Sequence, residues 1–506
     1  MDDMKKIPEE FDGKNEERGF KRSVAKQVLL GLFTNFSSIA PSMSLGFSAV
    51  SLPFLTDSTN PYALNKDEAS WFASIASLAT PFGCIFSGPI ADRFGRRTAM
   101  FTINVLCFIG WLIIASAYYY PDHLYSLLLL GRLLTGLSTG LSSIPATIYM
   151  AEISSSKLRG VFCTWNSIAF AVGVLIIYFL GFVLKGNWGV ISIITAAFPC
   201  VGMVLVSFLV PESPAWLIRK DRFGEAKVNM CKIFGTKDYI PEVAQEIEIL
   251  VKNRGTKTGT TQKSVAEQVA KKVKHLIKPN CLKPFSLIAS FFFFQQFAGT
   301  FVIVFYAIDI VKEAGVEMDA YLTIVIIGLV RLFTAMSVSY ISKIFGRRPL
   351  SMFSGCGMTI CMFALGGYIF AIDQGQVSQS TQDSLVFLPV ALLLLYFFTS
   401  TAGFLPMPFA MSAEVFPAKI RGTASGLVSG MGYFFNFITV KIYPNMIEGI
   451  GRHGVFFFYG AMSLAGTIFV VALLPETRGK TLQEIEEYFG KKTSKRNSLL
   501  KEPIRV

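Results

Sequence analysis

Two stretches of the sequence place a carboxylate and a guanidinium at the same spacing. AEISSSKLRG at residues 151–160 and AEVFPAKIRG at residues 413–422 each hold a glutamate seven residues before an arginine. A carboxylate and a guanidinium form charge-assisted hydrogen bonds that are often bidentate. The residue types and their spacing therefore predict ion pairs that involve Glu152, Arg159, Glu414 and Arg421.

Two further polar clusters also occur twice, in the same order along the chain. Gly-Arg-Arg stands at residues 95–97 and again 251 residues later, at 346–348. Pro-Glu-Ser at 211–213 returns as Pro-Glu-Thr at 475–477, an offset of 264 that is close to the 262 residues between the two glutamates above. Self-similarity at nearly one offset indicates an internal repeat. The chain is therefore predicted to consist of two similar halves.

The elements that carry these clusters are predicted from the hydropathy. The chain has 506 residues, a mean hydropathy of +0.50 and only 16% charged residues, which is typical of an integral membrane protein. Crossing a bilayer takes about 20 apolar residues in an α-helix, because backbone polar groups in lipid must pair within their own segment. The sequence predicts twelve such spans, near residues 27–49, 70–90, 98–120, 124–150, 161–184, 188–210, 285–309, 320–342, 349–372, 385–411, 422–447 and 453–474.

The basic residues predict the orientation of these spans. They concentrate in the N-terminal segment, the polar gap after the sixth span, the C-terminal tail and every second loop. The alternate loops hold only Lys66, Lys185, Lys312 and Arg452. This is the positive-inside pattern, so both termini and the gap are expected in the cytoplasm. We interpret the net charge of +13 as topology and expect no nucleic-acid partner.

The predicted fold is an all-α membrane protein with twelve transmembrane helices in two pseudo-symmetric six-helix bundles. Two amphipathic patterns in the polar gap, at 240–254 and 264–278, predict short helices beneath the bundles. The predicted organisation is a cytoplasmic N-terminal segment (1–26), a first bundle (27–210), a cytoplasmic helical linker (211–284), a second bundle (285–474) and a cytoplasmic C-terminal tail (475–506).

Internal symmetry of this kind is typical of transporters whose two halves rock around a central site. We therefore hypothesise that the repeated charges pair between the bundles and hold the cytoplasmic face closed. The alternative is that each cluster only marks the membrane interface, as basic residues commonly do.

The ordered motifs resemble those of the sugar porter branch of the major facilitator superfamily. Within that branch the chain is similar to the insect facilitated trehalose and hexose transporters. The resemblance implies the major facilitator fold, alternating access, a sugar substrate held between the bundles, and a multi-pass protein of the plasma membrane. The motifs that carry it are GPIADRFGRR (88–97), GR (131–132), PATIYMAEISSSKLRG (145–160), PESPAWL (211–217), QQFAGTFVIVFY (295–306), PMPFAMSAEVFPAKIRG (406–422) and PETRGKTLQEIEEYF (475–489).

The resemblance also implies which residues form the site. Gln295 and Gln296 match the paired glutamines of the family, Asn436 matches an asparagine, and Tyr306 matches a gate tyrosine. Amide side chains suit sugar hydroxyls because they both donate and accept hydrogen bonds. The gating set expected at the cytoplasmic ends comprises Asp92, Arg93, Arg96, Arg97, Glu152, Arg159, Arg347, Arg348, Glu414 and Arg421.

Four expected cavity positions depart from the family pattern. Ser167 replaces a glutamine, Phe301 and Arg331 replace asparagines, and Phe409 replaces the tryptophan that stacks on the sugar ring. We predict a cavity with fewer amides and more aromatic surface than a typical glucose site. A guanidinium in mid-span is costly unless it meets water or a partner. Arg331 is therefore predicted either to contact the substrate or to pair with Asp309.

Energy coupling is predicted from the first and fourth spans. In proton-coupled family members an acid follows Gly-Tyr in the first span and faces the fourth-span arginine. The matching stretch here is Gly46-Phe47-Ser48, the first span holds no acid, and Arg132 is kept. A symporter needs a titratable group in the pathway, so the sequence predicts a facilitator that moves sugar down its gradient.

Other function classes receive less support from the sequence. The three histidines are scattered, and no phosphate-binding glycine motif occurs in a polar segment, so we expect no metal, no cofactor and no enzymatic activity. The expected partners are a small-molecule sugar and the lipid bilayer. Two alternatives remain open, namely a carrier of a non-sugar solute such as a polyol or an amphiphilic small molecule, and a non-transporting sugar sensor.

Overall fold

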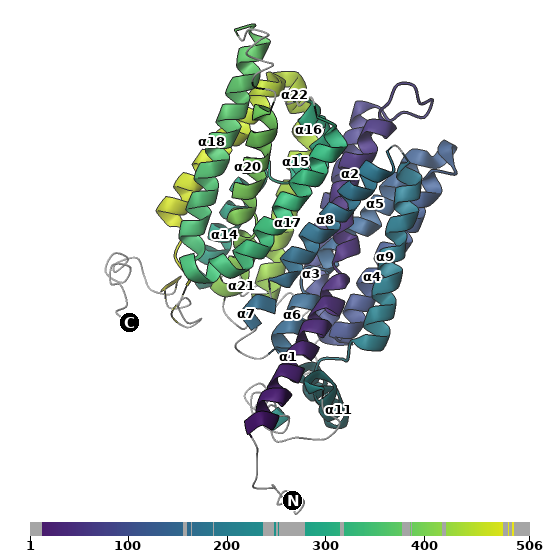
Figure 1. Ribbon diagram of the computed structural model, residues 1–506, viewed down its shortest axis with the longest axis vertical. Helices are drawn as coiled ribbons and strands as arrows, with labels where there is room; N and C mark the ends of the chain where they lie inside the picture. The colour runs from purple at the N-terminus through teal and green to yellow at the C-terminus, as the bar shows by residue number, and fades with distance from the viewer. Residues whose placement is uncertain are drawn as a thin grey trace, which may run out of the picture.

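The helices of the chain form two groups that stand side by side (Figure 1). The computed structural model describes residues 13–154, 159–162, 164–185, 187–235, 247–248, 251, 279–313, 318–376, 385, 387–416, 421–478, 484 and 488–489. The first half runs from purple to teal and the second from green to yellow in Figure 1. We call the end that carries the two Gly-Arg-Arg turns the motif end, and the opposite end the far end.

The first half contains six spans, two of which are broken. A bend of 42° separates α1 from α2 in the first span, and a short turn separates α5 from α6 in the fourth. The elements are α1 (Gly13–Phe36), α2 (Ile39–Leu55), α3 (Lys66–Phe94), α4 (Arg96–Ala117), the 3-10 turn η1 (Pro121–His123), α5 (Leu124–Leu141), α6 (Pro145–Ile153), α7 (Arg159–Phe162), α8 (Trp165–Val183) and α9 (Trp188–Leu209).

The second half repeats this plan. Its first span is divided among α14, α15 and α16, its fourth is divided between α20 and α21, and α22 is broken by Gly451 at a φ of +72° into two spans. With these breaks counted, each half has six spans, which confirms the predicted fold class. The elements are α14 (Pro279–Phe297), α15 (Val302–Phe305), α16 (Ala307–Glu313), α17 (Ala320–Phe345), α18 (Arg347–Asp373), α20 (Leu388–Ala402), α21 (Met407–Val415) and α22 (Arg421–Leu473).

Two parts of the motif end differ from the sequence prediction. Helix α1 begins at Gly13 rather than near residue 27, because most of the charged residues ahead of the apolar run are Lys, Arg and Glu, which are good helix formers. Helices α10 (Pro214–Arg219) and α11 (Phe223–Phe234) were not predicted. Apart from residues 247, 248 and 251, the two predicted linker helices lie outside the described residues.

The breaks in the seventh and tenth spans expose backbone groups inside the protein. Helix α14 ends before Gly299, whose φ is +87° and where an added Cβ would lie 2.7 Å from the Tyr459 ring. Helix α20 ends at Ala402, and residues 403–406 form a turn before α21. Irregular backbone at membrane depth is tolerated only where other groups in the protein satisfy it. The turn carbonyls are therefore available to side chains of the neighbouring span.

Contacts between the halves run along two helix pairs. Helix α3 packs against α22, and α8 packs against α17. At the far end α2 also packs against α15 and α16. These helices determine which side chains of the two halves meet.

Candidate functional site

Three amide side chains form a continuous hydrogen-bonded chain in the second half. Gln295 Nε2 donates to the carbonyl oxygens of Phe404 and Leu405, at 3.1 and 2.7 Å. Gln296 Nε2 donates to Gln295 Oε1 at 3.0 Å, and Asn436 Nδ2 donates to Gln296 Oε1 at 3.0 Å. All three side chains are buried. The structure thus joins the predicted residues of α14 and α22 to the turn that precedes α21.

This amide chain ends on the other half of the molecule. Ser77 of α3 donates its hydroxyl hydrogen to Asn436 Oδ1 at 2.6 Å, and it is fully buried. Ser77 could not be identified from the sequence, because its contact joins residues 359 positions apart. Only the packing of α3 against α22 brings the two together.

Aromatic rings pack against one another on α14, α21 and α22, two of which carry the amides. Phe409 packs edge-on against Phe292 with ring centroids 4.8 Å apart, and its centroid lies 6.1 Å from that of Tyr433. The ring centroid of Phe301 lies 6.4 Å from that of Tyr433. Ser167 is exposed near the start of α8. Two of the departures from the family pattern, Phe301 and Phe409, therefore add apolar rings to the second half.

Arg331 lies inside the protein on α17 without the partner that we had considered. Its guanidinium is over the ring of Phe397, 5.8 Å from the centroid, and its Nη1 is buried without a hydrogen-bond partner. The structure shows no ion pair with Asp309, so the pairing hypothesis is wrong for this structure. Arg331 lies eleven residues into α17, about 16 Å along the axis, whereas Asp309 belongs to the short helix α16.

Another buried guanidinium, that of Arg132 on α5, is fully hydrogen-bonded by neutral groups. Its Nη2 donates to Ser48 Oγ at 2.6 Å and its Nη1 to Ser44 Oγ at 3.0 Å. It also donates to the backbone carbonyls of Ser44, Phe72 and Ala73. Ser48 is the residue that follows Gly46-Phe47, where the family resemblance places the acid of proton-coupled members.

The charged residues of the motif end form a compact network in the first half. Arg96 donates Nε and Nη2 to the two carboxylate oxygens of Glu152, at 3.0 and 2.9 Å. Glu152 also accepts from Ser213 and Arg219, and Arg96 also donates to Asp92 at 3.1 Å. Arg97 donates to the backbone carbonyls of Val206 and Ser207, whereas Arg93 is exposed beside Phe94.

The second carboxylate of this network, that of Glu212, caps the N-terminus of α4. Glu212 accepts hydrogen bonds from the backbone N–H groups of Arg96 and Arg97, which are the first residues of α4. Helix N-termini favour such anions. Burial raises the pKa of Glu212, although the backbone N–H groups of Ser213, Arg96 and Arg97 and the charge of Arg96 oppose that rise.

The second half repeats the network with equivalent residues. Arg347 donates to Glu414 at 2.8 Å, and Glu414 also accepts from Thr477 at 2.6 Å. Glu476 accepts from the backbone N–H groups of Arg347 and Arg348 at the start of α18, and Arg348 donates to the carbonyl oxygen of Val471. The predicted repeat is therefore reproduced in three dimensions.

One predicted feature of this network does not hold in the structure. We expected the repeated carboxylates to pair between the bundles, but Glu152 pairs with Arg96 of its own bundle and with Arg219 of the linker, and Glu414 pairs with Arg347 of its own bundle. The reason is that the Gly-Arg-Arg turn of each half lies beside the end of the fourth span of the same half. The side chains of Arg159 and Arg421, the other candidates, lie outside the described residues.

Ion pairs between the halves occur instead at the far end. Lys441 of α22 donates to Asp67 and Ser70 of α3, both at 2.6 Å, and lies 4.5 Å from the Trp71 ring centroid. Among the described residues, the other ion pairs between the halves are Lys66 with Glu448, and Lys185 with Asp319 at 2.7 Å. Tyr306, the predicted gate residue, is buried close by, with its hydroxyl donating to Val440 O at 3.4 Å and its ring 4.7 Å from that of Tyr443.

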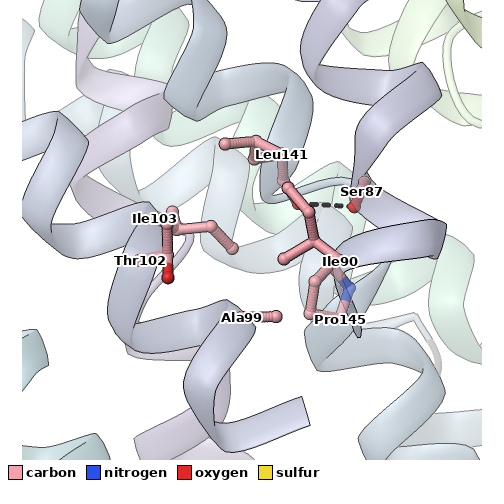
Figure 2. A pocket seen from close by; sticks show the side chains of 7 residues that line it. All are labelled: Ser87, Ile90, Ala99, Thr102, Ile103, Leu141 and Pro145. Carbon is pink, nitrogen blue, oxygen red and sulfur yellow. Dashed lines mark hydrogen bonds between the residues drawn. The ribbon is translucent and has the colours of Figure 1, made fainter. Parts of the chain in front are cut away.

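A small crevice in the first half does not qualify as a site. It lies among α3, α4, α5 and α6, and Figure 2 shows its lining of Ser87, Ile90, Ala99, Thr102, Ile103, Leu141 and Pro145. The hydroxyl of Ser87 already donates to Leu141 O at 2.7 Å. The crevice is too narrow to hold a water molecule. We assign it no ligand.

Comparison with solved structures identifies the fold. The proton:xylose symporter XylE bound to 6-bromo-6-deoxy-D-glucose superposes with a TM-score of 0.71 at 21% identity, over 92% of this chain and 100% of that chain. The inward-open conformation of XylE from E. coli gives a TM-score of 0.72 at 20% identity, over 91% of this chain and 99% of that one. Identities this low establish the major facilitator fold alone.

Comparison of sequences identifies the family. A facilitated trehalose transporter Tret1-2 homolog of Drosophila simulans is 29% identical over 462 residues, which are 91% of this chain and 90% of the relative. Trehalose transporter 1 of Drosophila melanogaster is also 29% identical, but this chain spans only 51% of its length. The family model described as "Sugar (and other) transporter" matches residues 30–489. With its repeated motif-end networks and its central amides, the chain belongs to the sugar transporter family.

Proposed function

We propose that the chain carries a hexose or trehalose across the membrane by facilitated, uniport transport with alternating access. Membership of the sugar transporter family supports the substrate class, and the similarity to facilitated trehalose transporters supports the choice of sugars. The observation that carries the proposal is the chain of Gln295, Gln296 and Asn436, which ends on the opposite half at Ser77. Amides at the meeting of two halves can bind sugar hydroxyls in either state.

The same side chains leave hydrogen-bond capacity for a sugar. Gln296 Nε2 and Asn436 Nδ2 each have two hydrogens, and the amide chain uses one of each. The Nη1 group of Arg331 supplies further donors. Phe301 and Phe409 provide apolar surface for the ring face of the sugar, and Ser167 offers a hydroxyl from the first half. Tyr306 is proposed to gate the far end.

The surroundings of Arg132 support uniport rather than proton coupling. Its guanidinium is held by the hydroxyls of Ser44 and Ser48 and by backbone carbonyls, none of which titrates near neutral pH. The predicted first span contains no acid that could take a proton there. Net movement of sugar then follows the sugar gradient alone.

The orientation is proposed from the charge distribution. The motif end, both termini and the linker face the cytoplasm, and the membrane is the plasma membrane. In this orientation the ion pairs between the halves lie outside, so the structure corresponds to a state that is closed on the outside. The motif-end networks then stabilise the cytoplasmic end of each half.

Uptake in cells that lack hexose transporters tests the proposal. Radiolabelled glucose, fructose and trehalose are supplied separately, with and without a protonophore. We expect saturable uptake of at least one sugar that the protonophore leaves unchanged. Uptake that stops when the proton gradient collapses contradicts uniport. A well-expressed protein that carries none of the three contradicts the sugar assignment and favours a non-sugar solute or a sensor.

Arg331→Gln tests the proposed substrate contact in the same cells. We expect the KM for sugar to rise by about 10-fold, because a charged donor is worth about 1.5 kcal/mol in a hydrogen bond. Membrane abundance should stay close to that of the unmodified protein, since Arg331 Nη1 has no protein partner to lose. A collapse of abundance with an unchanged KM would assign Arg331 to the scaffold instead.

A further inference from the structure

The hydrogen bonds of the amide chain have a direction that is fixed at one end. The backbone carbonyls of Phe404 and Leu405 can only accept, so Gln295 must present Nε2 to them and keep Oε1 for its neighbour. Gln296 must then donate Nε2 to Gln295 and keep its own Oε1. By the same logic Asn436 must donate Nδ2 to Gln296 and turn Oδ1 away from it.

The last group of the chain must therefore be a donor. Asn436 Oδ1 faces α3, and the hydroxyl of Ser77 donates to it at 2.6 Å. Both side chains are 1% exposed, so water does not substitute for the hydroxyl. A buried carbonyl oxygen without a donor is costly. Ser77 is thus the one side chain of the first half that completes the amide chain among the described residues.

We propose that Ser77 is a positioning residue that holds the sugar-binding amides in one orientation from the opposite half of the molecule. This inference rests on the proposed function, because it assigns the amides to sugar. Without the hydroxyl, Asn436 Oδ1 is buried without a donor, and Asn436 can leave that position only at the expense of its hydrogen bond to Gln296. The spare hydrogens that bind sugar lose their fixed positions.

The arrangement also gives the first half a part in binding without a direct contact to sugar. Ser77 lies on α3, which packs against α22, whereas the amides belong to α14 and α22. Correct orientation of Gln296 and Asn436 therefore requires that the two halves meet at this level. Substrate affinity depends on the approach of α3 to α22.

Substitution of Ser77 tests the inference, with a neighbour on the same helix as the control. Ser74 is also fully buried on α3, but its hydroxyl donates to the carbonyl of Ser70 within its own helix, at 2.7 Å. We expect Ser77→Ala to raise the KM for the carried sugar by about 5- to 10-fold with kcat within about twofold, as loss of one buried hydrogen bond predicts. Ser74→Ala should leave the KM unchanged.

Ser77→Thr separates positioning from packing. The threonine hydroxyl can still donate to Asn436 Oδ1, so most of the affinity should return, with a KM within about threefold of the original. A KM for Ser77→Ala that equals that of Ser74→Ala, or one that falls, overturns the inference. Equal losses for alanine and threonine assign Ser77 to packing and overturn it as well.

A second measurement does not depend on the substrate, so it separates this inference from the proposed function. Thermal unfolding midpoints of the purified protein are compared for Ser77→Ala, Asn436→Ala and the double variant. If the two side chains are bonded, the Tm of the double variant falls by less than the sum of the single decreases. Additive decreases overturn the Ser77 contact even if sugar uptake is confirmed. Non-additive decreases without any sugar uptake support the contact and contradict the function.

Discussion

The two ends of the molecule use ion pairs in opposite ways. At the far end Lys441, Lys66 and Lys185 each bind a carboxylate of the other half. At the motif end Glu152 and Glu414 bind arginines of their own half. Within the part of the chain that the structure describes, the ion pairs between the halves all lie at the far end.

This difference indicates that the ion pairs of the two ends have different roles. When two halves rock as rigid bodies, contacts between them must break at the end that opens, whereas contacts within a half move together. The far-end pairs therefore contribute to the equilibrium between the open and closed states of that end. The motif-end networks contribute to the stability of each half and are expected to persist in both states.

The largest effect is expected where a buried motif-end pair is broken. The Arg96 side chain is 2% exposed and binds Glu152 with two hydrogen bonds, so Arg96→Leu leaves a partly buried carboxylate without its main partner. We expect a loss of about 3 kcal/mol of stability and a strong decrease in membrane abundance. Fluorescence-detected size-exclusion chromatography of the tagged protein measures the abundance.

The equivalent change in the second half sharpens the comparison. Arg347 is 23% exposed and makes one hydrogen bond to Glu414, so Arg347→Leu should cost less, about 1–2 kcal/mol. In both variants, the protein that still reaches the membrane should keep the original ratio of exit KM to entry KM, because neither pair joins the halves. A changed ratio would show that these pairs do control opening, as we first expected.

The location of these networks could be predicted from the sequence, but which arginine pairs with which carboxylate could not. The repeated motifs placed Arg96, Glu152, Arg347 and Glu414 at one end, because sequence order fixes which loops share a membrane side. Whether a carboxylate meets an arginine of its own half or of the other depends on the packing of helix ends. The repeat also could not indicate the far-end pairs, since Lys441 and Asp67 belong to no repeated motif.

The same limit applies to the centre of the molecule. Sequence resemblance identified Gln295, Gln296 and Asn436, and the structure brings them into one hydrogen-bonded chain. The resemblance did not identify Ser77, which is one of many serines in apolar spans. Only the register of α3 against α22 places Ser77 at the amides. The breaks in the spans, which supply the Phe404 and Leu405 carbonyls, were likewise hidden within continuous apolar runs.

An intermediate effect is expected at Lys441–Asp67, the far-end pair whose lysine makes additional contacts. Lys441 is 22% exposed and combines its ion pair with Asp67, a hydrogen bond to Ser70 and the face of Trp71. We expect Lys441→Ala to favour opening of the far end by about 1 kcal/mol and to lower the entry KM by about fivefold, because a larger fraction of molecules can bind sugar from that side. Zero-trans entry and exit kinetics measure the shift.

Arg452→Ala is the matched control for this prediction. Arg452 also lies at the far end and is bound to Asp373, but both belong to the second half. The Arg452→Ala substitution removes the same charge from the same end without breaking a contact between the halves, so the entry KM should remain unchanged. Equal shifts for the two variants would assign the effect to surface charge rather than to closure.

The smallest effect is expected at an exposed pair between the halves. Lys185 and Asp319 are 57% and 36% exposed, and pairs of this kind contribute little because water screens them. Asp319 also accepts from the backbone N–H of Tyr321 at the start of α17. Asp319→Asn is the informative change, because asparagine caps a helix equally well and removes only the charge. We expect the entry KM to fall by less than about twofold.

The pH dependence of this pair has a defined sign. The hydrogen bond from Lys185 holds the pKa of Asp319 below its ordinary value. The contribution of the Lys185–Asp319 pair to closure is therefore complete above the ordinary carboxyl pKa. It is lost only as the pH falls through the lowered pKa of Asp319. Between neutral and mildly acidic medium the entry KM of the unmodified protein should not change on account of this pair. A fall in entry KM over that range that disappears in Asp319→Asn would show that this exposed pair, rather than Lys441, controls opening of the far end.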